Sequence, residues 1–358
     1  MKVMMFNDKE VKPNKINVVL FSGGRGTNTI TKTFLKYPDI SLSIIVNAYD
    51  DGLSTGRLRE FIPGMLGPSD VRKNICQLLS DDDRSCRYLE YLLDYRFGNE
   101  ISFNNAIDCL NSFKQRELPE IKELAEAYAY LNLTQAKWIS LFCDVFISYT
   151  LRKKEEGQVF DFVDCSIGNI FFSGCFLYNN NDFNQTIKTF SEFCEIRGTV
   201  LNVTNGENCV LTALKEDMTF LKCEADIVAP QSSVCISEIF LLKRYLKSTI
   251  VEEFKDKTKA EIKSILEGES EYPEINPDAK IVLENADVII YGPGTQNSSL
   301  FPSYLTKGLV EAIVGNKTAE KVFVSNIRKD YEIQGENINS LTNKFFYNIS
   351  RKNSVNVN

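Results

Sequence analysis

The adjacent acids Asp50 and Asp51 belong to the segment of this sequence with the clearest chemical potential, NAYDDGLSTGRLRE. The side chains of Ser54, Thr55 and Arg57 follow them. Paired carboxylates beside hydroxyl groups and an arginine suit a magnesium-bound phosphate, because Mg²⁺ takes oxygen ligands and a guanidinium group holds phosphate through two hydrogen bonds. The alternative is a solvated turn in which the Asp-Gly step merely bends the chain.

A glycine-rich turn, SGGRGTN, separates an apolar run from a segment with helical spacing. It matches neither G-x-x-x-x-G-K-[ST] nor G-x-G-x-x-G, two well-known phosphate-binding patterns. Gly23, Gly24 and Gly26 nevertheless permit positive φ angles and close approach of the backbone, and the following helix offers free N–H groups to an anion. The turn therefore predicts an anion site, with a tight turn that binds nothing as the alternative.

Three other segments carry polar groups that have both a structural and a functional interpretation. GPSDVRKN predicts a helix with a Ser/Asp cap, in which Asp70, Arg72 and Asn74 are ordinary helix residues or part of a site wall. In DCSIGNIFFSG, Asn169 offers an amide to a base or sugar, and equally to local backbone groups. The loop YGPGTQNSS is a second candidate for binding phosphate or ribose, or a plain strand-to-helix turn.

Composition excludes several kinds of chemistry. The 358 residues include no histidine, which removes an imidazole base and the Ser-His and Cys-His nucleophile pairs. A net charge of −7 argues against a nucleic-acid binder. The N-terminus lacks the apolar core of a signal peptide, and the most apolar long segment, 131–151, contains Lys137 and Asp144, so we expect no membrane span. The ten cysteines are scattered, which suits reduced thiols and a cytoplasmic protein.

The elements that must position these groups alternate between strand and helix. Strands at 16–21 and 41–47 around a helix at 28–37 predict a parallel βαβ unit, whose strand C-termini share one edge of the sheet. Later strands and helices continue the pattern, while a helical insertion interrupts it at about 75–155. The sequence therefore predicts an α/β fold with a mostly parallel sheet. The candidate segments that follow strands should converge at its edge.

The chain resembles the family of the 2-phospho-L-lactate transferases (CofD-like) and the related gluconeogenesis-factor or UPF0052 proteins. The resemblance runs through VVLFSGGRGTN, NAYDDGLSTGRLR, GPSDVRKN, SIGN, RGTVLNVT and ADVIIYGPGTQNSSLFPSYLTKGLVEAI. It covers most of the chain outside the insertion and the termini. The chain departs from the usual motifs at Arg25, where threonine is common, and at Leu53 and Ser69, where glycine is common.

The resemblance implies a Rossmann-like, three-layer fold, a single CofD-like domain over 1–358, that binds a nucleotide-linked ligand. The transferase branch moves a phospholactyl group from a guanosine diphosphate-linked donor to a deazaflavin precursor, with magnesium. The other branch binds UDP-sugars and is associated with carbon or cell-wall regulation. We therefore expect a nucleoside diphosphate-linked ligand of UDP or GDP type, Mg²⁺, and transfer of a phosphoester group to an alcohol. The alternative is a UDP-sugar-binding regulator without catalysis, and a homo-oligomer remains open.

By motif position, the resemblance implies that Asp50 and Asp51 bind Mg²⁺ or position an attacking hydroxyl group. It also implies that Asn28 caps the first helix and that Asn169 meets the base or ribose. The positions implied to hold phosphate are Ser22, Gly23, Gly24, Gly26, Thr27, Ser54, Thr55 and Arg57. The rest of the pocket is assigned to Asp70, Arg72, Asn74, Gly292, Pro293, Gly294 and Thr295.

Overall fold

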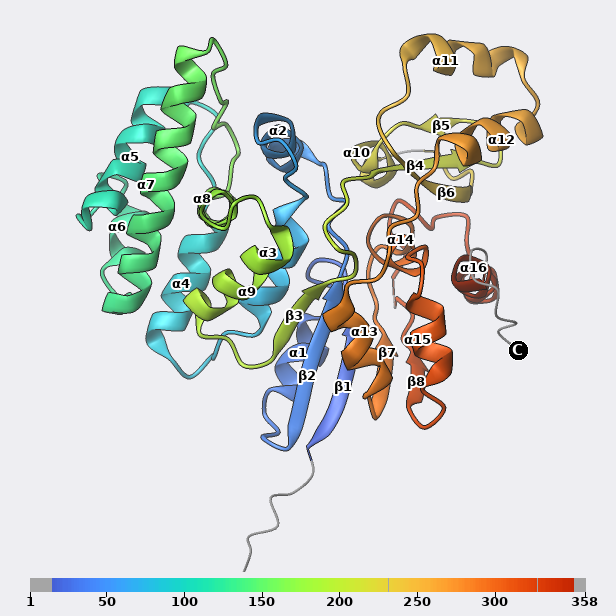
Figure 1. Cartoon of the computed structure of the whole chain (residues 1–358), viewed down its shortest axis with the longest axis horizontal. Coiled ribbons are helices and arrows are strands. Elements are labelled where there is room, and N and C mark those ends of the chain that lie inside the picture. The colour runs from blue at the N-terminus through green and yellow to red at the C-terminus, as the bar shows by residue number, and fades with distance from the viewer. Residues whose placement is uncertain (1–14, 231, 327, 351–358) are drawn as a thin grey trace, which may run out of the picture.

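A five-stranded sheet in the order β3-β2-β1-β7-β8 forms the centre of the computed structural model, and every neighbouring pair of strands is parallel (Figure 1). The structure describes residues 15–230, 232–326 and 328–350, so the expectation about a signal peptide falls largely on residues 1–14, outside the described residues. The strands are β1 (Ile16–Phe21), β2 (Ile40–Val46), β3 (Thr199–Asn202), β7 (Val288–Tyr291) and β8 (Glu320–Phe323).

Alternating residues of β1 face opposite sides of this sheet, and helices cover both sides. Val18 and Leu20 belong to one apolar core, shared with the helices that precede β3. Val19 and Phe21 belong to the other core, shared with the helices of the C-terminal part. Because parallel strands are buried on both faces, they are continuous apolar runs. The predicted three-layer α/β fold and the βαβ unit around α1 (Asn28–Phe34) are confirmed.

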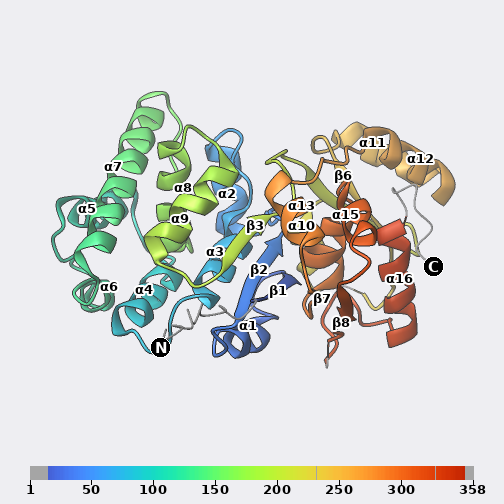
Figure 2. The ribbon, with the colours of Figure 1, turned by 60° about the horizontal axis from the view of Figure 1, so that its bottom comes forward.

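Helices α2 to α9 fill the chain between β2 and β3, which is a longer helical stretch than the expected insertion. The longest of them, α7, begins with a reciprocal capping box between Asn132 and Gln135. Figure 2 shows α5, α6 and α7 as the outer layer of this helical region. The helices are α2 (Leu53–Phe61), α3 (Pro68–Gln77), α4 (Arg84–Asp94), α5 (Phe103–Gln115), α6 (Lys122–Tyr128), α7 (Leu133–Glu155), α8 (Ile167–Tyr178) and α9 (Phe183–Cys194).

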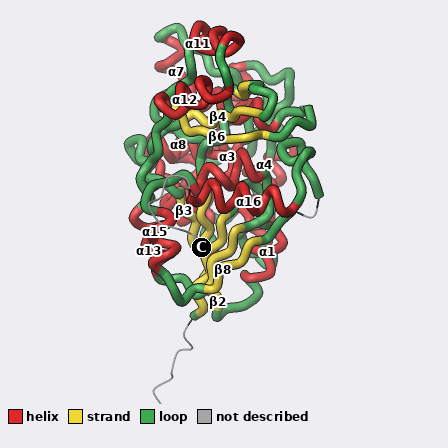
Figure 3. Tube along the Cα trace, turned by 90° about the vertical axis from the view of Figure 1, so that its right-hand side faces the viewer, coloured by secondary structure: helices red, strands yellow, loops and turns green. Residues whose placement is uncertain are grey.

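A second, antiparallel sheet in the order β5-β4-β6 lies beyond the carboxyl ends of the main strands (Figure 3). Its antiparallel pairing departs from the mostly parallel sheet that the sequence predicts. One face of the sheet packs through Leu214 and Phe240 against Phe254 and Ile262. The elements of this region are β4 (Val210–Lys215), β5 (Phe220–Leu221), α10 (Glu224–Val228), β6 (Ile236–Leu242), α11 (Ser248–Glu252), η1 (Glu253–Asp256) and α12 (Lys259–Glu269).

The C-terminal part surrounds β7 and β8 with helices. After β7 the chain makes a π-helical turn, η2 (Gln296–Leu300), before it continues as α14. None of the helices in the described part of the chain is both long and apolar enough to cross a membrane. The remaining helices are α13 (Pro277–Glu284), α14 (Phe301–Tyr304), α15 (Leu309–Gly315) and α16 (Ile338–Ser350).

Candidate functional site

A cavity of about 1030 Å³ lies where β1 and β7 run side by side, at the point where the strand order reverses. In open α/β sheets, ligands bind at such a switch point, outside the carboxyl ends of the strands. The turn after β1 and the loop after β7 form facing parts of the cavity wall. The predicted site residues that line the cavity are Gly24, Gly26, Asp50, Asp70, Pro293, Gly294 and Thr295.

The glycines of the turn after β1 serve close packing, whereas the positive φ that they permit is not used. Gly23, Gly24 and Gly26 are absent from the residues with positive φ, which corrects that part of the expectation. A Cβ atom on Gly26 would lie 2.8 Å from the carbonyl oxygen of Pro293, and one on Gly23 would overlap Cβ of Ser299. Larger residues would therefore push apart the two loops that bound the cavity.

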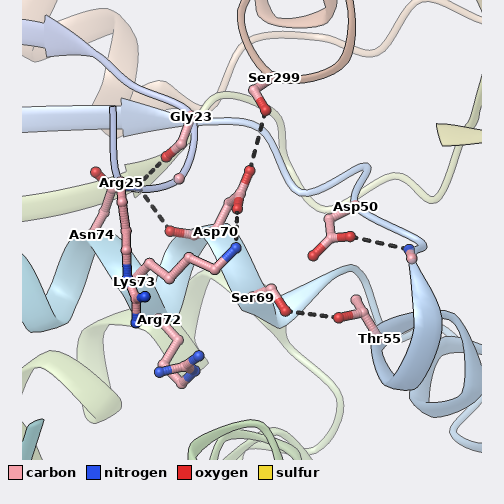
Figure 4. Close-up of polar contacts among 12 residues, drawn as sticks. Gly23, Arg25, Asp50, Thr55, Ser69, Asp70, Arg72, Lys73, Asn74 and Ser299 are labelled. Atoms are coloured by element: carbon pink, nitrogen blue, oxygen red, sulfur yellow. Dashed lines mark hydrogen bonds and ion pairs between the residues drawn. The ribbon is translucent and has the colours of Figure 1, made fainter. Parts of the chain in front are cut away.

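Amide side chains from α3 hold two carbonyl groups of this turn, and Figure 4 shows the contact between Asn74 and Gly23. Asn74 donates from Nδ2 to the oxygen of Gly23, and Gln77 donates from Nε2 to the oxygen of Gly24 at 2.8 Å. No residue in the described part of the chain accepts a hydrogen bond from the backbone N–H groups of residues 23–27. Unpaired N–H groups in succession are what a backbone anion site requires.

Two helix starts differ from the expectation. The first position of α1 is Asn28, so the cap position falls on Thr27 and Asn28 is not the cap. The hydroxyl of Thr27 pairs with that of Ser22 at 2.6 Å and does not bond to the helix backbone. Helix α3 begins at Pro68, whose fixed φ suits the first helical position, and not at a Ser/Asp cap. Asp70 therefore lies within the first turn of α3, where it reaches the cavity.

Four acids line the cavity, and three of them, Asp50, Asp70 and Glu224, interact through their charges. Burial raises the pKa of the Glu224 carboxyl, and the nearby charges of Asp50 and Asp70 raise it further. Burial also raises the pKa of Asp50; Asp70 adds to this shift and Lys73 opposes it. Lys73 donates to Asp70 at 2.9 Å, and this carboxylate raises the lysine pKa. One lysine does not balance the charge of these three carboxyl groups, so the cluster favours binding of a cation or a proton.

Asp51 and Ser54 do not line the cavity. The carboxylate of Asp51 accepts a hydrogen bond from the hydroxyl of Tyr245, in the loop after β6, so it is tied to the small sheet. Ser54 is buried in the first turn of α2. Of the two acids that the resemblance assigns to Mg²⁺, the structure thus brings only Asp50 to the cavity.

Thr55 and Arg57 connect α2 to neighbouring segments. The hydroxyl of Thr55 pairs with that of Ser69 at 2.7 Å, which fastens α2 to α3 (Figure 4). Arg57 donates to the carbonyl oxygen of Val163, and its guanidinium lies 3.7 Å from the carboxylate of Asp161. Neither side chain lines the cavity, because both are directed to the helical layer.

A chain of polar side chains centred on Arg72 joins the glycine turn to the helical layer. Arg72 donates from Nε to Oδ1 of Asn169 at 2.9 Å and from Nη1 to Oδ1 of Asp94 at 2.7 Å. Asp94 also pairs with Arg25 of the glycine turn. Asn169 donates from Nδ2 to the hydroxyl of Ser69 at 3.1 Å. Arg72 and Asn169 are buried and do not line the cavity, so they support its wall from behind.

The segment after β8 forms a further part of the cavity wall that the sequence analysis missed. Asn326 holds the loop after β7 in place: it accepts from the N–H of Gly294 at 2.7 Å and donates to the carbonyl oxygen of that residue at 2.8 Å. Gly292 lies outside the cavity, where a Cβ would come 2.5 Å from the oxygen of Phe21. Glu224 was also missed, because it follows a two-residue strand without a recognisable motif.

The acids at the cavity fit a magnesium ion that is shared with a ligand. Mg²⁺ is commonly held by one or two carboxylates together with phosphate oxygens and water. Asp50 and Asp70 offer such carboxylates beside the unpaired N–H groups of the glycine turn. Among the described residues, no group of three or more His, Cys, Asp or Glu side chains is arranged to hold a metal ion. A bound metal would therefore need oxygen atoms from the ligand.

The sheet order and the cavity define an open α/β protein with a cavity at the switch point. A family model described as 2-phospho-L-lactate transferase CofD matches residues 18–353, so the chain belongs to the CofD family. The resemblance drawn from the sequence is thereby confirmed.

Relatives of this chain include proteins named gluconeogenesis factor. The one from Halalkalibacterium halodurans is 26% identical over 315 residues, which cover 87% of this chain and 67% of that protein. The one from Listeria innocua is 25% identical over 319 residues, which cover 89% of this chain and 68% of the relative. A crystal structure of a UPF0052-family protein from Bacillus halodurans matches with a TM-score of 0.62 at 22% identity, over 94% of this chain and 78% of that one. This likeness shows a shared fold.

Proposed function

We propose that the chain binds a nucleoside diphosphate-linked ligand in the switch-point cavity and transfers a phosphoester group from it to an alcohol. The observation that carries the proposal is the hydrogen bonding of the glycine turn. Its carbonyl groups at Gly23 and Gly24 are held by α3, while its N–H groups lack acceptors in the described part of the chain. Such a turn suits the phosphate oxygens of a diphosphate.

Asp50 is the residue of the cavity best suited to the acceptor alcohol. In the proposed reaction the alcohol oxygen attacks the distal phosphorus, the bridging P–O bond breaks, and a nucleoside monophosphate leaves. The alcohol proton passes to Asp50, whose raised pKa makes its carboxylate a stronger base than an exposed one. A bound Mg²⁺ would supply neutralisation of the phosphate charge. Without histidine, catalysis would rest mainly on positioning and charge.

A thermal-shift screen with UDP, GDP and their sugar and acyl conjugates, each with and without Mg²⁺, tests this proposal. A ligand at about 100 times its Kd adds about 2.7 kcal/mol to the free energy of unfolding. We expect a magnesium-dependent shift with one conjugate, and conversion of that conjugate when an alcohol acceptor is supplied. The absence of a shift with every conjugate would refute the proposal.

A regulator that binds a UDP-sugar without converting it is the second candidate. Two observations favour it: the relatives above are named gluconeogenesis factor, and only one of the two neighbouring acids reaches the cavity. Mass spectrometry of the bound ligand after prolonged incubation separates the two candidates. A ligand recovered intact in the presence of acceptor alcohols supports the regulator, and a recovered nucleoside monophosphate supports the transferase.

A further inference from the structure

Four basic residues line the cavity, and three of them already have partners. Arg25 pairs with Asp94, and Lys73 pairs with Asp70. Lys329 donates from Nζ to the carbonyl oxygen of Gln334 at 2.9 Å. Arg328 has no hydrogen-bond or ion-pair partner among the residues that the structure describes, although it lines the same cavity. An unpaired guanidinium at a ligand cavity is a natural partner for phosphate or carboxylate, because its planar fork gives two parallel hydrogen bonds.

Arg328 belongs to a strap, defined here as residues 324–326 and 328–336, which is fastened to the β7 side of the sheet before and after this residue. Before it, the N–H of Val324 donates to the oxygen of Tyr291 at 2.9 Å, and Asn326 is paired with Gly294. After it, Glu332 is buried against η2. Arg328 therefore lies between two anchored points of the backbone.

The carboxylate of Glu332 takes the place that an external anion could occupy at the start of η2. It accepts hydrogen bonds from the N–H of Asn297 at 2.8 Å, from the N–H of Ser298 at 3.1 Å and from the Ser298 hydroxyl. Nδ2 of Asn297 donates in turn to the backbone oxygen of Glu332 at 3.5 Å. These donors are thus unavailable to a ligand.

We propose that Arg328 binds a negatively charged group of the ligand that the glycine turn does not hold, and that Glu332 is the positioning residue that keeps the strap in place. The inference rests on the proposed binding of a phosphorylated ligand. It adds that the ligand is anionic at two separate points, one at the glycine turn and one at the strap.

Isothermal titration of the full chain with inorganic tripolyphosphate, an anion long enough to offer charge at more than one point, tests the role of Arg328. We expect Arg328→Gln to weaken binding about 10-fold, the loss typical of a charge-assisted hydrogen bond. Arg87→Gln is the matched control: it makes the same change at an exposed arginine of α4 that does not line the cavity, and it should leave affinity unchanged. Equal affinity of wild type and Arg328→Gln overturns the inference, and so does the absence of tripolyphosphate binding by the wild type. The proposed function is tested separately, by the thermal-shift screen with nucleotide conjugates.

A double-mutant cycle tests whether Glu332 acts through Arg328. Glu332→Ala should weaken tripolyphosphate binding as much as Arg328→Gln does, while Glu332→Gln, which keeps an acceptor for the same donors, should preserve it. In the Arg328→Gln background Glu332→Ala should cost nothing more, because the residue that it positions is already gone. An additional loss of affinity in that background overturns the positioning role of Glu332. If Glu332→Ala does not fold, Ser298→Ala, which removes only one donor, takes its place in the cycle.

Discussion

Arg72 donates a hydrogen bond from Nε to Oδ1 of Asn169 at 2.9 Å, between α3 and α8, and neither side chain lines the cavity. Residues 97 positions apart are thereby joined directly behind the site wall. The resemblance to the family assigns Asn169 to the base or ribose of the ligand. In this chain both ends of its amide are used, since Nδ2 donates to Ser69.

Replacing Asn169 with alanine should therefore destabilise the protein more than it weakens ligand binding. The change leaves Nε of the buried Arg72 without its acceptor, which costs about 1–3 kcal/mol. Urea denaturation measures this loss, and Asn104→Ala, at an exposed position of α5, is the control. Unchanged stability together with a large loss of nucleotide affinity would instead support the ligand contact that the resemblance implies.

Asp50 and Asp51 should differ sharply in their importance for turnover. Asp50→Asn removes the only base of this pair at the cavity and should lower turnover about 10²- to 10⁴-fold while the fold survives. Asp51→Asn, whose side chain still accepts the hydrogen bond from Tyr245, should retain most of the activity. Single-turnover assays with the conjugate found by thermal shift, alongside circular dichroism of both variants, measure the contrast. Similar losses in the two variants would contradict it.

The sequence was sufficient for the parts of the fold and site that depend on neighbouring residues. The run before Ser22 and the glycines after it predict a strand and a turn, and parallel pairing then brings the turn and the loop at Gly292 to one edge. The structure bears out this geometry: both loops bound the cavity. Local sequence also held the signal for α3, although its cap differs from the prediction, whereas α2 was not predicted.

The rest of the site depends on contacts between distant parts of the chain. Arg72 appears in a motif beside Asp70, yet it turns to the helical layer because Asp94 and Asn169 accept its hydrogen bonds there. Glu224 reaches the acids only because the small antiparallel sheet folds over the carboxyl ends of the main strands. The spacing of residues along the sequence reveals neither the hydrogen-bond partners of Arg72 nor the position of Glu224.

The buried carboxyl of Glu332 should make the stability of the protein depend on pH. Burial raises its pKa to about 7 from an ordinary value of 4.5. The folded state therefore binds this proton more tightly than the unfolded state does. The contribution of this proton to the free energy of unfolding is fully present below pH 4.5, and about 3 kcal/mol is lost as the pH rises through 7.

Glu332→Gln should remove this pH dependence. The variant should therefore be more stable than wild type at pH 8 by a wider margin than at pH 5. Urea denaturation at both values checks this, and a constant difference would contradict it.

Leu53 offers a test of backbone strain at the entrance to α2. Its φ is 44°, in the left-handed region that favours glycine, and its side chain is 75% exposed, so little packing offsets the strain. A residue with a Cβ pays about 1–2 kcal/mol in this conformation. Glycine relieves that cost but loses more entropy on folding, by about 0.4–1 kcal/mol. We therefore expect Leu53→Gly to be at least as stable as wild type, and Leu53→Ala, which keeps the Cβ, to be less stable than the glycine variant. Thermal denaturation of the three proteins decides the matter: if alanine is the more stable replacement, the left-handed conformation at this position carries no strain.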